Sequence, residues 1–254
     1  MLKYVHIEWF WWFVMIIIYD FDGTLTPYSL PQYPILRKYG YDDQKLLTRV
    51  KGEVANGMEL YEAFFKCYID ILTENGEPVS RDNVCLGARD VEYNKGVLEY
   101  FKRFQSDRTG IKHYVVTSGI AEYARESAVG DFVDGVYGTT FSENNGTYEK
   151  ANFVLSDKKK VDIIKRIVDS SADNERVVYF GDGLTDKFAF EYVHSIGGIN
   201  VFVAVNEEAK NNYHKLNEFG IIDRCFDADF SNGSQIGEFV QNLNVSVDNQ
   251  NRSL

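Results

Sequence analysis

The chain has 254 residues, a length that suits one large domain or a core domain with a sizeable insertion. Apolar residues make up 44% of the sequence and charged residues 26%, which is enough apolar material for a packed core. The formal net charge of −11 argues against nucleic-acid and anionic-membrane partners, because both require a basic protein surface. Cys67, Cys85 and Cys225 lie far apart, which argues against a disulfide framework or zinc site and favours a cytoplasmic protein.

The N-terminal segment is dominated by an apolar run at residues 9–19. This run is shorter than the roughly 20 residues of a membrane-spanning helix, and it lacks the basic start and cleavage site of a signal peptide. Its β-branched part at 14–19, VMIIIY, instead predicts a strand that is buried on both faces. The strand would be complete if translation began at Met15. Residues 1–14 are therefore expected to be an accessory extension or a misassigned start.

Residues 28–95 show no obvious buried strand and predict a small helical insertion. Apolar and aromatic residues recur there at helical spacing, at Met58, Tyr61, Phe64, Phe65, Tyr68, Ile69 and Leu72. Such a stripe is more typical of a helix core than of a cofactor contact, so we expect it to form the insertion's own core. Residues 1–27 and 96–254 are then expected to form the main domain.

Further strands alternate with helical patterns in the rest of the chain. The apolar runs at 113–116, 177–180, 200–205 and 221–226 predict strands, and 97–104 and 161–168 show helical periodicity. This alternation predicts an α/β fold with a doubly wound parallel sheet, in which ligands bind at the carboxyl ends of the strands. Asn145-Gly146 predicts a hairpin turn, and the polar tail after Leu243 is expected to be frayed.

Two carboxylates follow the first predicted strand directly. Asp20 and Asp22 are separated by one residue, and Gly23 permits a sharp turn after them. Two anions this close repel each other unless a cation joins them or one of them is protonated. Mg²⁺, which prefers oxygen ligands, would satisfy the pair. Taken alone, the pattern also fits a simple turn or helix cap.

A second acid-rich turn, GDGLTD, follows the strand at 177–180. It offers Asp182 and Asp186. By itself this turn also fits a capped strand-to-helix connection. Two such turns at the carboxyl ends of parallel strands are much less expected by chance than one. Together they predict a cation site of three or four carboxylates.

Groups suited to phosphate occur in two other segments. Thr117, Ser118 and Gly119 end a predicted strand and offer hydroxyl and backbone N–H donors at a helix N-terminus. Residues 158–160 are three lysines at the start of the helix before GDGLTD. At least two of these lysines are expected to be solvated.

These four segments, in the order DFDGTLT, VVTSG, a helix-opening lysine and GDGLTD, resemble the haloacid dehalogenase superfamily of hydrolases. The branch that the chain resembles most is the phosphoserine-phosphatase-like one. The resemblance implies a Rossmann-like core with a helical cap of the C1 type inserted after the first motif.

The resemblance also implies roles for the acidic residues. Asp20 corresponds to the nucleophile that forms an aspartyl-phosphate, and Asp22 to the general acid and base. The carboxylates of Asp20 and Asp182 and the carbonyl of Asp22 would hold Mg²⁺, with Asp186 supporting through water or hydrogen bonds. With an acid and base already supplied by Asp22, His113 is expected to be structural.

For the phosphate group, the resemblance points to Thr117 and Lys160, with Gly23, Ser118 and Gly119 as further binding positions. Thr117 matches the hydroxyl of the second motif, although its neighbour Ser118 remains an alternative. Lys160 is followed by apolar residues three, four and seven positions later, as the family's lysine is, whereas Lys158 is not. The lysine would stabilise charge on the phosphoryl oxygens.

The resulting expectation is a Mg²⁺-dependent phosphomonoester hydrolase that acts on a small phosphorylated metabolite. A metal-free dehalogenase is excluded because Asp22 is present. Phosphoserine is doubtful as the substrate, because residues 26–34 lack the glutamate that phosphoserine phosphatases carry there. The alternatives are a phosphotransferase or mutase with the same intermediate and a non-catalytic phosphate- or protein-binding module. The sequence leaves the oligomeric state open.

Overall fold

The computed structural model describes residues 15–28, 36, 38–77, 79–105, 109–171 and 175–252. Residues 1–14, with the expected extension or misassigned start, lie outside these ranges. The strands are β1 (Met15–Tyr19), β2 (Ile111–Ile120), β3 (Gly135–Asn144), β4 (Thr147–Phe153), β5 (Arg176–Gly181), β6 (Ile199–Ala204) and β7 (Arg224–Asp227). The α-helices are α2 (Asp43–Ala55), α3 (Leu60–Glu74), α4 (Arg81–Arg89), α5 (Val97–Arg103), α7 (Ala121–Glu126), α8 (Asp157–Asp169), α9 (Lys187–Ser195), α10 (Glu207–Asn217) and α11 (Gln235–Arg252).

The strands form one seven-stranded sheet in the order β4-β3-β2-β1-β5-β6-β7. All neighbours run parallel except β3 and β4, which form an antiparallel hairpin. The predicted Asn145-Gly146 turn closes this hairpin, with both residues at positive φ (50° and 80°), as a tight hairpin turn requires. The prediction of a doubly wound α/β sheet is therefore confirmed, with one antiparallel strand added at its edge.

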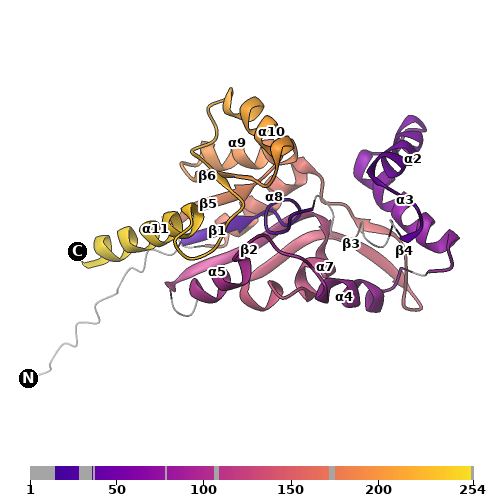
Figure 1. Cartoon of the computed structure of the whole chain (residues 1–254), viewed down its shortest axis with the longest axis horizontal. Coiled ribbons are helices and arrows are strands. Elements are labelled where there is room, and N and C mark those ends of the chain that lie inside the picture. The colour runs from indigo at the N-terminus through magenta and orange to yellow at the C-terminus, as the bar shows by residue number, and fades with distance from the viewer. Residues whose placement is uncertain are drawn as a thin grey trace, which may run out of the picture.

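Strand β1 lies at the centre of the sheet and is buried on both faces, as predicted. Ile17 and Tyr19 belong to one apolar cluster, and Ile16 and Ile18 belong to the other. Helices α8, α9 and α10 pack in the second cluster, whereas α5, α7 and α11 pack in the first. The continuous apolar run thus reflects a strand with helices on both sides, which cover the two faces of the sheet (Figure 1).

The predicted insertion contains three described helices that lie in two places. Figure 1 shows α2 and α3 beyond the end of the sheet, beside the β3–β4 hairpin, while α4 packs against the core helix α7. The ends of the insertion meet at Asn94, whose side-chain amide donates hydrogen bonds to the carbonyls of Thr24 (2.8 Å) and Thr26 (3.1 Å). The backbone N–H of Asn94 donates to Leu25 O as well (2.9 Å). The 28–95 boundary itself stays a prediction.

His113 lies in β2 and is fully buried beneath the central strand. Its Nε2 lies 2.7 Å from the carbonyl of Phe104 and its Nδ1 lies 3.0 Å from the hydroxyl of Tyr19. A carbonyl only accepts, so Nε2 carries the proton and Tyr19 donates to Nδ1. Burial lowers the pKa of His113 to about 4. The histidine is therefore a neutral member of the core, in agreement with the structural role expected for it.

Two local expectations were wrong. Strand β2 continues past residue 116 to Ile120, and its register with β3 shifts over this stretch, so Thr117–Gly119 lie in an irregular strand end and α7 begins only at Ala121. The tail after Leu243 is helical through Arg252, because α11 is anchored by the buried Ile236 and Val240 and simply continues from them. No helix in the described ranges is long and apolar enough to cross a membrane.

Candidate active site

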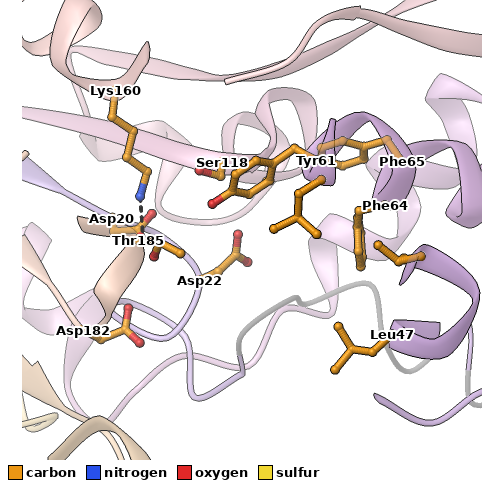
Figure 2. A pocket seen from close by; sticks show the side chains of 13 residues that line it. Asp20, Asp22, Leu47, Tyr61, Phe64, Phe65, Ser118, Lys160, Asp182 and Thr185 are labelled. Carbon is orange, nitrogen blue, oxygen red and sulfur yellow. Dashed lines mark ion pairs between the residues drawn. The ribbon is translucent and has the colours of Figure 1, made fainter. Parts of the chain in front are cut away.

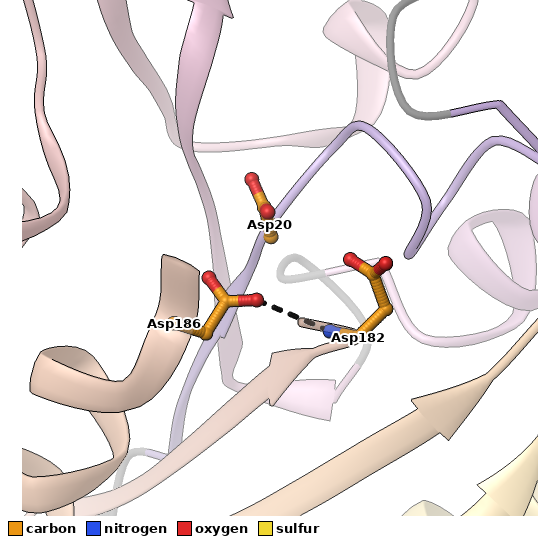
Figure 3. Close-up of side chains that lie close together, drawn as sticks. All are labelled: Asp20, Asp182 and Asp186. Atoms are coloured by element: carbon orange, nitrogen blue, oxygen red, sulfur yellow. Dashed lines mark hydrogen bonds between the residues drawn. The ribbon is translucent and has the colours of Figure 1, made fainter. Parts of the chain in front are cut away.

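The two acid-rich turns meet because β1 and β5 are neighbours in the sheet. The backbone N–H of Asp20 donates to Phe180 O (2.9 Å), which holds the ends of the two strands together. Asp20, Asp182 and Asp186 each place a carboxylate oxygen within 4.8 Å of the others, and Figure 3 shows the three side chains converging. The parallel arrangement of strands thus brings the two sequence motifs to one point.

Lys160 is the lysine that reaches this point. Its ammonium lies 3.0 Å from Asp20 Oδ2 and 2.8 Å from Asp186 Oδ1, and its side chain is 1% exposed (Figure 2). Burial acts to lower the pKa of Lys160, but the charges of Asp186 and Asp20 outweigh it and hold that pKa well above its ordinary value. Lys159 instead donates to Val154 O, and Lys158 lies over the ring of Phe188.

Asp186 is held by four donors. Its Oδ1 accepts from Lys160 and from the hydroxyl of Tyr179 (2.7 Å), and its Oδ2 accepts from the backbone N–H groups of Asp182 (3.1 Å) and Gly183 (3.2 Å). The arrangement favours a hydrogen-bonding role for Asp186 over direct metal coordination. Tyr179 was not predicted from the sequence. The signal that could have revealed it is its hydroxyl group, which stands in an otherwise apolar strand.

The carboxylate of Asp182 accepts fewer hydrogen bonds than that of Asp186. Its side chain is half-buried, and its Oδ1 accepts a hydrogen bond from Thr24 Oγ1 (3.1 Å). Gly23 lies directly beside it, because a Cβ at Gly23 would be 2.3 Å from Asp182 Oδ2, and Gly23 has φ +79°. Gly23, expected at a phosphate-binding position, therefore allows the backbone of the first motif to approach Asp182.

Asp22 lies on the side of the site that faces the second motif. Its Oδ2 accepts from Thr117 Oγ1 (3.0 Å), and Thr117 Oγ1 in turn accepts from the backbone N–H of Gly119 (2.9 Å). A Cβ at Gly119 would lie 2.4 Å from Asp22 Oδ2, so only glycine fits there. The other oxygen of Asp22 is buried and accepts no hydrogen bond from the described residues. Thr117 therefore orients Asp22 and leaves one carboxylate oxygen for another partner.

The electrostatics of the cluster are unbalanced. The site holds four aspartates, Asp20, Asp22, Asp182 and Asp186, and among its described residues one lysine, which pairs with Asp20 and Asp186. Burial raises the pKa of Asp20 to about 7, although the charge of Lys160 acts in the opposite direction. Burial likewise holds the pKa of Asp22 and of Asp182 well above the ordinary range, with further raising by neighbouring carboxylates. This excess of carboxylates, with one oxygen of Asp22 that accepts no hydrogen bond from the described residues, fits a hard divalent cation such as Mg²⁺.

A cavity of about 280 Å³ opens above the carboxylates. Its floor is polar and includes Asp20, Asp22, Ser118, Gly119, Lys160 and Asp182. Its opposite wall, which we call the roof, consists of side chains from α2 and α3 (Figure 2): Leu47, Val50, Leu60, Tyr61, Phe64 and Phe65. Ser118 and Gly119, which were expected to be phosphate-binding positions, thus line the cavity.

The roof corrects one sequence-based expectation. The aromatic stripe of the insertion was predicted to form the insertion's own core rather than a cofactor contact, and Phe65 and Tyr68 are indeed buried. Tyr61 and Phe64, however, are only half-buried and line the cavity. The difference arises because two helices alone cannot enclose every apolar side chain of α3.

The model of the haloacid dehalogenase-like hydrolase family matches residues 17–191. No curated protein matches the chain. A structure of phosphoserine phosphatase described as a phospho-aspartyl intermediate analogue is 17% identical, with a TM-score of 0.60, and the match covers 90% of this chain and 98% of that one. A substrate-bound phosphoserine phosphatase is 17% identical, with a TM-score of 0.59 and coverages of 84% and 92%.

A haloacid dehalogenase family hydrolase from Salmonella enterica serovar Typhi is 13% identical, with a TM-score of 0.59. The match covers 77% of this chain and 64% of that one, so the chain spans less than two thirds of that protein's length. At these identities the likeness to solved structures is one of fold. The family match, which extends from the first acid-rich turn through the second, shows that this chain belongs to the haloacid dehalogenase-like hydrolase family.

Proposed function

We propose that the chain is a Mg²⁺-dependent phosphomonoester hydrolase that acts on a small phosphorylated metabolite through an aspartyl-phosphate intermediate. The observation that carries this proposal is the placement of Asp20. Its carboxylate lies at the floor of the cavity, paired with a fully buried lysine and next to a second carboxylate, Asp22, that has a free oxygen. The name of the phosphoserine phosphatase structures supports phosphate-ester chemistry on this fold.

In the first step, a carboxylate oxygen of Asp20 attacks phosphorus and the bond from phosphorus to the alcohol oxygen breaks. Asp22, protonated at the start, gives its proton to the departing alcohol oxygen. In the second step, Asp22 accepts a proton from water, the water oxygen attacks phosphorus, and the bond to Asp20 breaks. Inorganic phosphate leaves, and both aspartates return to their starting states.

The other residues hold and orient these groups. Lys160 offsets the charge of Asp20 and of the phosphoryl oxygens, and Asp186 holds Lys160 in place. Thr117 fixes the rotamer of Asp22 and accepts the N–H of Gly119, whereas the Ser118 hydroxyl, which lines the cavity, is a donor for a phosphate oxygen.

Mg²⁺ would be held by the carboxylates of Asp20 and Asp182 and the carbonyl of Asp22. When bound, the ion would reduce the repulsion between the anionic nucleophile and the anionic phosphate. Asp186, with its four hydrogen bonds, would support this set without entering it.

We further propose that residues 28–95 form the cap and that residues 1–27 and 96–254 form the core. The cap helices α2 and α3 would then exclude water from the cavity. The three cysteines are free thiols, which fits a reducing cytoplasm.

The test is phosphate release from a panel of phosphorylated metabolites, with Mg²⁺ and with EDTA. We expect turnover that requires the metal. Asp20→Asn should lower kcat by about 10⁴-fold or more, since the covalent step is lost. Asp131→Asn, at an exposed aspartate outside the cavity lining, is the matched control and should retain activity. Undiminished turnover by Asp20→Asn would exclude the covalent mechanism, and phosphate binding without turnover would favour a binding module.

A further inference from the structure

We infer that the substrates are monoesters of phosphate with neutral, predominantly apolar alcohols, rather than with amino acids or sugar acids. This inference rests on the proposed phosphatase function and concerns the leaving group alone. It comes from the roof of the cavity, which would contact whatever part of the substrate extends away from the phosphate (Figure 2).

The roof presents apolar surface to the cavity. Of its six residues, five are purely hydrocarbon side chains. Two of these are strongly exposed, Leu47 at 46% and Leu60 at 53%, although large apolar side chains are stabilised by burial. An apolar leaving group would remove both from water, which gives these exposed leucines a function.

Charged groups that could recognise an amino acid are absent from the described lining. Lys160 is its one cation, and that ammonium is already engaged by Asp20 and Asp186. A carboxylate on the leaving group would therefore meet no counter-charge and would lie near Asp22 and Asp182. An ammonium group would meet no acid on the roof, because the acids of the lining lie on the floor, where Asp20, Asp22 and Asp182 serve the proposed reaction and metal. Burying either charge without a partner is costly.

The roof does contain one polar atom, the hydroxyl of Tyr61. It donates to a carboxylate oxygen of Asp157 at the start of α8. Tyr61 lies near Ser118 at the border between floor and roof (Figure 2). Because the hydroxyl donates its proton to Asp157, it cannot donate that proton to the leaving group. The other five side chains of the roof are apolar.

The size of the cavity restricts the alcohol further. A volume of about 280 Å³ lies just below the usual range of roughly 300–1,000 Å³ for drug-sized ligands. Phosphate occupies part of that space, so a short alkyl or single-ring alcohol fits. Because Leu47, Val50 and Leu60 are interspersed with the aromatic rings, the wall suits hydrocarbon better than a quaternary ammonium, which aromatic cages bind.

A series of n-alkyl phosphates from propyl to hexyl tests the inference, since the leaving-group pKa hardly changes along it. With saturating Mg²⁺, kcat/KM should rise by about two- to fourfold per added methylene until the cavity is filled, fourfold being the value of one fully buried CH₂. Phosphoserine and phosphocholine, measured alongside, should rank below hexyl phosphate. A flat series, or a preference for either charged ester, would overturn the inference.

A pair of variants on α2 separates the roof from general effects on the helix. Leu47→Gln should reduce the gain per methylene to less than about twofold, since it places an amide in the wall. Val54→Gln, at a residue that is 38% exposed and outside the cavity lining, should leave the series unchanged. If both variants flatten the series equally, the effect does not come from the roof. Absence of phosphate release from every ester would instead refute the proposed function.

Discussion

The floor and the roof of the cavity are built in opposite ways. Floor carboxylates are fixed by short hydrogen bonds and ion pairs from strand ends and adjacent backbone, as the four donors to Asp186 show. The roof consists of side chains on two helices, with one hydroxyl as its polar atom among the described residues. Reaction chemistry requires atoms held to fractions of an ångström, whereas contact with an apolar group does not. The comparison suggests that reaction and substrate choice can change separately.

After loss of the nucleophile Asp20, the largest expected effect is also on the floor, from Asp22→Asn. With butyl phosphate, kcat should fall by about 10²- to 10⁴-fold, the usual contribution of a general acid. With an aryl phosphate of low leaving-group pKa the loss should be smaller, because that oxygen departs without a proton. Steady-state rates with the two esters measure the difference. Equal losses with both would mean that Asp22 does not protonate the leaving group.

The two acids of the second turn should also differ. Asp186→Ala removes the acceptor of Lys160 and of Tyr179, and we expect it to lower the free energy of unfolding by about 3–5 kcal/mol. Asp182→Ala should not destabilise the metal-free protein, since it removes one of several repelling carboxylates. It should instead raise the Mg²⁺ concentration for half-maximal activity by at least about tenfold.

Urea unfolding in EDTA measures the change in stability. Titration of the activity with Mg²⁺ measures the change in the metal concentration required. The matched control is Asp131→Asn, which should change neither quantity. An Asp186→Ala protein as stable as the parent would refute the structural role assigned to that carboxylate.

The core beneath the floor should respond to pH through His113. Its pKa is about 4 in the folded protein, below the value of about 6.5 in an unfolded chain, so folding favours the neutral ring. Its contribution is complete above pH 6.5 and is lost as the pH falls towards 4. Between pH 7.5 and 5 the loss is about 2 kcal/mol.

Urea unfolding of the parent and of His113→Asn at these two pH values, in EDTA, measures this loss. The variant should be less stable at pH 7.5 and should lack the His113 part of the pH dependence. Taking the difference between the proteins removes the contribution of the buried carboxylates, which are present in both. Identical pH dependence would show that the ring is not held neutral.

The smallest expected effect is on the roof, where two neighbouring leucines provide a matched pair. Leu46 is fully buried in α2, whereas Leu47, which lines the cavity, is 46% exposed. Leu46→Ala should lower the free energy of unfolding by about 2–5 kcal/mol, and Leu47→Ala by about 0.5 kcal/mol or less. Equal destabilisation would show that the roof is part of the packed core, and the contrast between roof and floor would lose its basis.

Much of the core could be predicted from the sequence because its signals are local. A buried parallel strand is a continuous apolar run, and each of the acid-rich turns follows such a run, so their meeting at one sheet edge follows from strand polarity. The choice of Lys160 over its two neighbours required the spacing of a known family as well.

The roof could not be predicted in the same way. Periodicity shows that α3 has an apolar face, but the residues of that face that contact α2 and those that contact the cavity are decided by how the two helices pack. Phe65 and Tyr61 look alike in the sequence and both line the cavity, but Phe65 is buried whereas Tyr61 is only half-buried. The continuation of α11 to Arg252 depends likewise on its anchorage in the core.

The three hydrogen bonds that join Asn94 to residues 24–26 have a topological consequence. The chain leaves the turn after β1 and returns to that turn at Asn94, so residues 27–93 form an excursion whose two ends are held together. Closing such an excursion costs an entropy that grows only slowly with its length. Helices of other lengths could therefore be grafted between these two points while the strand order and the acidic edge stay as they are. The fold thus offers a position at which new substrate preferences can arise by exchange of a segment.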